Sequence, residues 1–114
     1  MRVLLLLTVA LSMVACASKP SVSTSSYQDR LKQYCLDNLS AEQQQNEAFR
    51  NKCAIHAMTN IHLAEEIYDT KADQDYADCS KSHSEEVLIN QCFVDKKSAY
   101  FERWTNDALK RSKK

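Results

Sequence analysis

The sequence predicts an all-α protein, either a small four-helix bundle or a pair of helical hairpins, stapled by disulfide bonds. The chain of 114 residues contains no glycine and one proline. This composition excludes most β architectures, because their turns need residues with a positive or preset φ. Apolar residues also recur at intervals of three and four, as they do on one face of a helix. Finally, four cysteines follow residue 16 and are available to join such helices.

The first two expected helices cover residues 27–39 and 41–68. Ser26 with Asp29, and Ser40 with Gln43, stand in the N-cap and N3 relation of a capping box, which marks a helix start. One face of the first helix carries Tyr27, Leu31, Tyr34, Cys35 and Leu39. One face of the second carries Phe49, Cys53, Ala57, Ile61, Ala64, Ile67 and Tyr68.

Two further helices are expected in the second half of the chain. Thr70 with Asp73 opens a short one, which carries Ala72, Tyr76 and Cys79. Ser82 with Glu85, or Ser84 alone, opens the last one, over residues 85–110. Its apolar face is formed by Leu88, Ile89, Cys92, Phe93, Ala99, Tyr100 and Trp104, and Phe101 is expected to point away from that face. Short connections favour antiparallel neighbours.

The beginning of the chain resembles the signal of bacterial lipoproteins. Arg2 precedes an apolar run over residues 3–11, which has the length of the apolar region of a signal peptide and falls short of the roughly 20 residues that span a bilayer. Met13-Val14-Ala15-Cys16 then resembles the lipobox of that family, which usually has leucine where this chain has Met13. The resemblance implies cleavage after Ala15 and acylation of Cys16.

Two or three acyl chains on Cys16 would hold the protein stably on a membrane. Because Ala17 and Ser18 follow, instead of aspartate, the resemblance implies the outer membrane of a Gram-negative cell, with the domain facing the periplasm or the cell surface. An ordinary secretory signal cleaved after Ala17 is the alternative. The expected organisation is a signal peptide (1–15), a lipidated N-terminus with a flexible serine-rich tether (16–26), a helical domain (27–110) and a basic tail (111–114).

Cysteine usage agrees with export, because an even number of cysteines in an oxidising compartment indicates disulfides. The four are Cys35, Cys53, Cys79 and Cys92. Sequential pairing, Cys35–Cys53 with Cys79–Cys92, is favoured over nested pairing, since each half has a cysteine, a serine-containing turn and a second cysteine in an apolar-periodic run. The spacings contain no C-x-x-C pair and do not match a zinc site.

No catalytic, metal or cofactor site is expected. His56 and His62 lie about 120° apart around a helix and so do not share a face, whereas His62 and Glu66 form an i,i+4 pair that supports the helix. Without glycine there is neither a phosphate-binding loop nor a G-x-S-x-G nucleophile motif. The formal net charge of zero gives no basic footprint for nucleic acid.

The remaining function classes are a protein-binding module and a carrier. A lipid-anchored adaptor would recruit or cap an envelope protein, and aromatic and arginine side chains are common interface anchors. The candidates on the last helix are Lys96, Tyr100, Arg103 and Trp104. The alternatives are an inhibitor of an envelope hydrolase and a periplasmic ligand or metal carrier. A carrier pocket would involve Tyr34, Phe49, Met58, Tyr76 and Trp104 and would be concave, whereas a binding module would expose an apolar patch.

Overall fold

The computed structural model describes residues 19–113, which form helices and, within that range, no strand. The chain runs through α2 (Ser25–Asp37), α3 (Ala41–Gln44), α4 (Glu47–Asp69), α5 (Ala72–Ser82) and α6 (Glu86–Ser112). The predicted all-α class is therefore confirmed.

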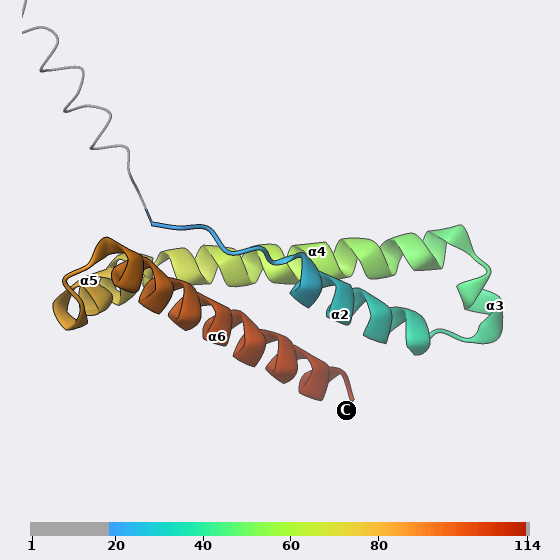
Figure 1. Ribbon diagram of the computed structural model, residues 1–114. Helices are drawn as coiled ribbons and strands as arrows, with labels where there is room; N and C mark the ends of the chain where they lie inside the picture. The colour runs from blue at the N-terminus through green and yellow to red at the C-terminus, as the bar shows by residue number, and fades with distance from the viewer. Residues whose placement is uncertain (1–18, 114) are drawn as a thin grey trace, which may run out of the picture.

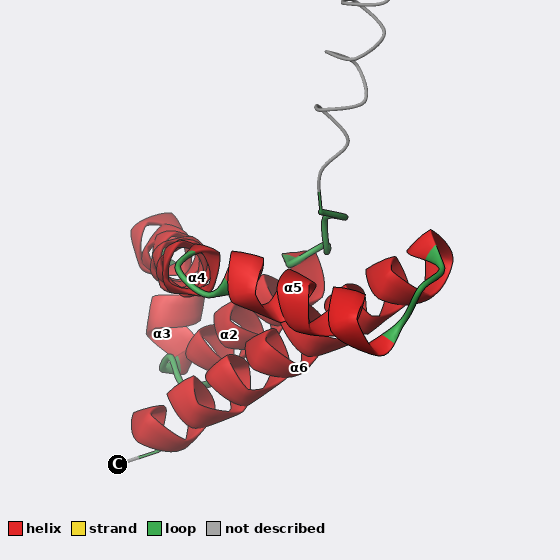
Figure 2. Cartoon of the chain, turned by 90° about the vertical axis from the view of Figure 1, so that its left-hand side faces the viewer, coloured by secondary structure: helices red, strands yellow, loops and turns green. Residues whose placement is uncertain are grey.

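The helices form two hairpins, α2 with α4 and α5 with α6, and the two hairpins contact each other mainly through α6 (Figure 1). After the short α3, α4 runs back along α2, and α5 packs on the first part of α6. α6 then runs along α2 and also contacts α4, so that the second hairpin lies across the first (Figure 2). The architecture is the paired-hairpin form of the expected fold.

The long helix expected over residues 41–68 is divided in two. Ser40 does form the predicted capping box with Gln43, but the helix it opens, α3, ends after one turn. Asn46 then has an extended backbone and starts α4 by accepting a hydrogen bond from the Ala48 amide at 2.9 Å. Asparagine is a preferred N-cap residue because its side chain satisfies a free amide of the first turn.

Two hydroxyls that were expected to open helices instead close the preceding ones. Thr70 Oγ1 donates to the carbonyl of Ile67, at the end of α4. Ser82 Oγ donates to the carbonyl of Asp78, at the end of α5. Hydroxyl side chains can satisfy the carbonyls of a last turn as readily as the amides of a first turn, and spacing alone does not distinguish the two roles.

The N-terminal segment, residues 19–24, lies along α4 before α2 begins (Figure 1). Lys19 Nζ is 2.6 Å from Asp73 Oδ1 at the start of α5, and Thr24 Oγ1 donates to Glu65 on α4 at 2.9 Å. Ser26, the expected N-cap, lies inside α2. This part of the expected serine-rich tether is therefore packed against the helices. The expected signal peptide and Cys16 lie outside the described residues.

The core consists of two clusters on either side of Tyr100. One contains Tyr68, Ala72, Cys79 and Phe93 and holds α5 and the start of α6 against the end of α4. The other contains Ile61, Ala64 and Phe101, with Tyr27, Leu31 and Trp104 packed around them, and joins α2, α4 and α6. The ring of Phe101 stacks on Tyr27 with 5.7 Å between centroids. The expectation that Phe101 points away from the core is therefore wrong.

Candidate functional site

The two disulfides each close one hairpin. Cys35 of α2 is bonded to Cys53 of α4, and Cys79 of α5 is bonded to Cys92 of α6. This is the predicted sequential pairing, and the nested alternative is excluded. Each disulfide therefore lies within one hairpin. The two hairpins are connected to each other by the polypeptide between α4 and α5 and by noncovalent contacts.

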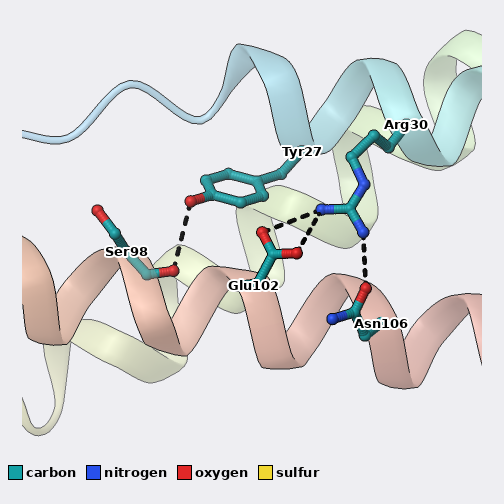
Figure 3. A network of polar contacts seen from close by, with 5 residues as sticks. All are labelled: Tyr27, Arg30, Ser98, Glu102 and Asn106. Atoms are coloured by element: carbon teal, nitrogen blue, oxygen red, sulfur yellow. Dashed lines mark hydrogen bonds and ion pairs between the residues drawn. The ribbon is translucent and has the colours of Figure 1, made fainter.

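A polar network joins α2 to α6 beside the second core cluster (Figure 3). Arg30 donates from Nη1 to both carboxylate oxygens of Glu102 at 3.0 Å, and from Nη2 to Asn106 Oδ1 at 2.6 Å. Tyr27 Oη donates to the carbonyl oxygen of Ser98 at 3.3 Å. The arginine–carboxylate pair is partly exposed, so it contributes at most about 1 kcal/mol and mainly fixes the register of the two helices.

A concave cavity of about 310 Å³ opens between α2, α4 and the C-terminal part of α6. Its walls include the side chains of Leu31, Tyr34, Ala57, Ala108 and Leu109, and the Cys35–Cys53 disulfide. The described residues that line it include no Asp, Glu, Lys or Arg. Sequence analysis did not predict this cavity, because it depends on how α6 is placed against the first hairpin.

The four partner-binding candidates on α6 do not form one surface. Lys96 and Arg103 are exposed and line a shallow depression together with Lys71, whereas Tyr100 and Trp104 are partly buried. The Tyr100 hydroxyl is buried without a hydrogen-bond partner within residues 19–113, and burial raises the pKa of this phenol above its ordinary value.

Trp104 is fixed by a contact to α4. Its indole Nε1 donates to Asn60 Oδ1 at 2.6 Å, and Asn60 lines the cavity. Trp104 therefore lies between the second core cluster and the cavity, where it connects α6 to α4.

Tyr68 and Asp75 form a partly buried polar contact at the junction of α4 and α5. Tyr68 Oη donates to Asp75 Oδ2 at 2.9 Å. Burial, followed by the hydrogen bond to Asp75 and its negative charge, raises the pKa of Tyr68 well above its ordinary value. Lys71 Nζ lies 3.7 Å from the same carboxylate oxygen. The neutral Tyr68 phenol and Lys71 thus both contact the Asp75 carboxylate. We interpret these contacts as structural, because they hold the start of α5 against the end of α4.

His56 and His62 lie at different positions on α4 and have different surroundings. His62 Nε2 is 3.1 Å from Glu66 Oε1 in the expected i,i+4 pair on the exposed face of α4, and His56 lines the cavity. Within residues 19–113, no group of three or more His, Cys, Asp or Glu side chains is arranged to hold a metal ion.

The side chains proposed for a carrier pocket are not brought together. Tyr34 lines the cavity, but Met58 faces solvent and Tyr76 packs edge-on against Phe93 in the other core cluster. Of the five expected residues, only Tyr34 is among the described residues that line the cavity; Phe49, Met58, Tyr76 and Trp104 are not.

The outer face of α4 is the feature that sequence analysis missed. Ile55, Met58 and Leu63 are 58%, 52% and 48% exposed. They belong to residues 53–64, twelve consecutive residues without Asp, Glu, Lys or Arg in a chain in which 26% of residues are charged. That run is a visible signal, because a helix with one solvated face normally carries charges there.

Comparison with models of protein families, with curated proteins and with solved structures finds no match to this chain. In the part of the chain that the structure describes, none of the helices combines the length and the apolar character needed to cross a membrane.

Proposed function

We propose that this chain is a bacterial envelope lipoprotein, held on the outer membrane by acyl groups on Cys16, whose helical domain binds another envelope protein through the outer face of α4. The observation that carries the proposal is the exposure of large apolar side chains on that face. The proposal assigns no catalytic activity to the chain.

The spacing of the outer face supports recognition as a helix. Ile55, Met58 and His62 follow one another at i, i+3 and i+7, so they lie along one side of α4, and Leu63 lies next to them. Such a row fits a partner with an apolar groove, which buries the anchors of one helix. Burying a fully exposed side chain of this kind contributes about 1.5–3 kcal/mol. Ile55, Met58 and Leu63 are about half exposed, so each contributes about half of that and the three together add a few kcal/mol to the affinity.

The anchor would hold the domain near the membrane by the end of α4 and the start of α5. Lys19 follows Cys16 by three positions along the chain, which allows a reach of about 10 Å between the two backbones. Lys19 is paired with Asp73 at the start of α5. An acylated Cys16 would therefore hold Lys19 near the bilayer, and with it the junction of α4 and α5, so that a partner in the same membrane would be within reach.

The anchor is tested by the intact mass of the protein purified from membrane fractions, before and after reduction and alkylation. The proposal expects a chain that begins at Cys16 and carries acyl groups, with four thiols that become accessible after reduction. An unacylated chain that begins at Ser18 would refute the anchor and indicate a soluble exported protein.

The binding face is tested by site-specific photo-crosslinking in envelope preparations. A photoreactive amino acid at Met58 should give a discrete adduct with one envelope protein, and Ile55→Glu should remove it. The matched control places the same amino acid at Asp107, an exposed position on α6. Equal adducts at both positions, or none at Met58, would refute the proposed face.

Inhibition of an envelope hydrolase is a special case of the same proposal. The adduct would then contain the hydrolase, and the purified domain would lower its activity. Ile55→Glu should restore that activity, because it places a charge in the apolar contact.

A further inference from the structure

We infer that the cavity between α2, α4 and α6 binds an aliphatic chain, namely the acyl chain of a small amphiphile whose head group accepts hydrogen bonds. This inference concerns residues 31–112 and does not rest on acylation of Cys16 or on the outer face of α4. It can therefore fail or succeed independently of the proposed function.

The size of the cavity fits such a chain. Its volume of about 310 Å³ lies at the lower end of the range for small-molecule sites. At about 30 Å³ for each water-sized group, the space takes about ten methylene-sized groups. A complete phospholipid with two chains is too large, whereas one medium-length acyl chain fits.

The cavity exists because small side chains face each other where the helices diverge. The core elsewhere is filled by large rings such as Tyr68, Phe93 and Phe101. Here α4 presents Ala57 and α6 presents Ala108, both buried. Figure 1 shows α6 diverging from α4 toward its C-terminal end, so these alanines leave a gap that α2 closes from the third side.

The lining selects an aliphatic ligand. Leu31, Leu39 and Leu109 provide branched aliphatic surface from two helices and the loop after α2, and the Cys35–Cys53 disulfide adds further apolar atoms. Since no Asp, Glu, Lys or Arg is among the described lining residues, the part of the ligand inside the cavity must be uncharged.

Neutral polar groups at the same cavity favour a head group that accepts hydrogen bonds. Asn60 uses its carbonyl oxygen for the Trp104 indole, so its amide nitrogen remains as a donor. Asn38 and His56 also line the cavity. A head-group oxygen that reaches Asn60 can accept from its amide while the chain lies on the leucines.

The single tryptophan of the chain gives a direct readout. The purified domain would be titrated with laurate and with a lysophospholipid that carries one lauroyl chain, both below their micelle concentrations. The Trp104 emission spectrum and isothermal calorimetry should show saturable binding of one molecule. Binding of either probe supports the inference, and the preferred probe identifies the head group. Binding of neither overturns it.

Cavity filling provides the specific control. Ala57→Phe occupies the space and should weaken binding about tenfold or more. Val87→Phe adds the same ring at a position of α6 that is 76% exposed and does not line the cavity, and it should leave binding unchanged. Equal weakening by both substitutions, or by neither, would overturn the inference.

A second measurement avoids dependence on the folding of the Ala57 variant. In the wild-type domain, isotope-edited nuclear Overhauser effects should connect the methylenes of bound laurate to the methyl groups of Ala57, Ala108 and Leu109. Contacts confined to Ile55 and Leu63 would place the ligand on the outer face and contradict the cavity site.

Discussion

Replacing Phe101 by alanine is expected to lower the free energy of unfolding by about 3–5 kcal/mol. Phe101 is fully buried and belongs to the cluster in which α2, α4 and α6 meet. Its ring stacks on Tyr27 and lies edge-on to Tyr100 at 5.5 Å between centroids. Each aromatic pair contributes about 0.5–1.5 kcal/mol beyond the buried area, which favours the upper part of the expected range.

The assay is urea unfolding followed by far-ultraviolet circular dichroism, with both disulfides intact. With a slope of about 2 kcal/mol per molar urea, a loss of about 4 kcal/mol lowers the midpoint by about 2 M. Val87→Ala is the matched control on the same helix, because Val87 is 76% exposed. It should change stability by no more than about 0.5 kcal/mol.

A loss below about 1 kcal/mol for Phe101→Ala would refute the packing described for α6, since burying a phenylalanine contributes at least about 1.5 kcal/mol. It would mean that this side of α6 faces solvent, as the sequence pattern first indicates. Should the alanine variant fail to fold, Phe101→Leu provides a smaller deletion, and its loss should lie between those of the alanine variant and the control.

The other predictions concern local contacts. Replacing both cysteines of either disulfide by alanine should lower the free energy of unfolding by about 3 kcal/mol, because the two closed loops are of similar length, 18 and 13 residues. If urea unfolding gave losses that differ threefold between the two disulfides, loop length would not account for their contributions. Asn46→Ala should cost about 1 kcal/mol by removing the α4 cap, whereas Gln45→Ala should have little effect. Because the folded pKa of Tyr68 is raised, the stability it contributes is complete below the unfolded pKa of 10.0 and is lost at higher pH. Thermal unfolding of Tyr68→Phe should therefore depend less on pH above that value than the wild type, and an identical dependence would count against a raised pKa. Glu102→Gln should cost at most about 1 kcal/mol, with a smaller difference from the wild type at high salt.

The sequence predicts the helices and the disulfide pairing because both depend on local patterns. Cys53, Ala57, Ile61, Ala64 and Tyr68 repeat at helical spacing, and all five are buried. Pairing within each half follows from the similarity of the two cysteine-bounded segments. The division of the long helix at Asn46 also has a local cause, a capping side chain followed by Glu47, which a single periodic pattern conceals.

The prediction for α6 fails where one helix contacts several neighbours. Phe93 faces α5 and the end of α4, whereas Phe101 meets α2 and Ile61 of α4. The buried surface therefore turns around α6 along its length. A single apolar stripe includes Phe93 and omits Phe101, because the placement of α2 cannot be deduced from the α6 sequence.

The candidate site was predicted less completely. The aromatic residues Tyr100 and Trp104 attract attention as possible anchors, yet both are partly buried by neighbouring helices. The cavity arises from Ala57 and Ala108, whose small size has meaning only after α4 and α6 are placed together. The exposed apolar face of α4 could have been suspected from the uncharged run over residues 53–64.

The placement of the disulfides also determines what a single proteolytic cut would release. Each bond joins two helices of the same hairpin, and within residues 19–113 neither bond crosses from one hairpin to the other. A cut between α2 and α4, or between α5 and α6, leaves the pieces covalently attached. A cut at residues 70–71, in the turn between α4 and α5, divides the molecule into two fragments that separate on a denaturing gel without reductant. Between Cys53 and Cys79, residues 70–71 are the only stretch outside a helix, so this turn is where a protease would most readily separate the two disulfide-linked halves.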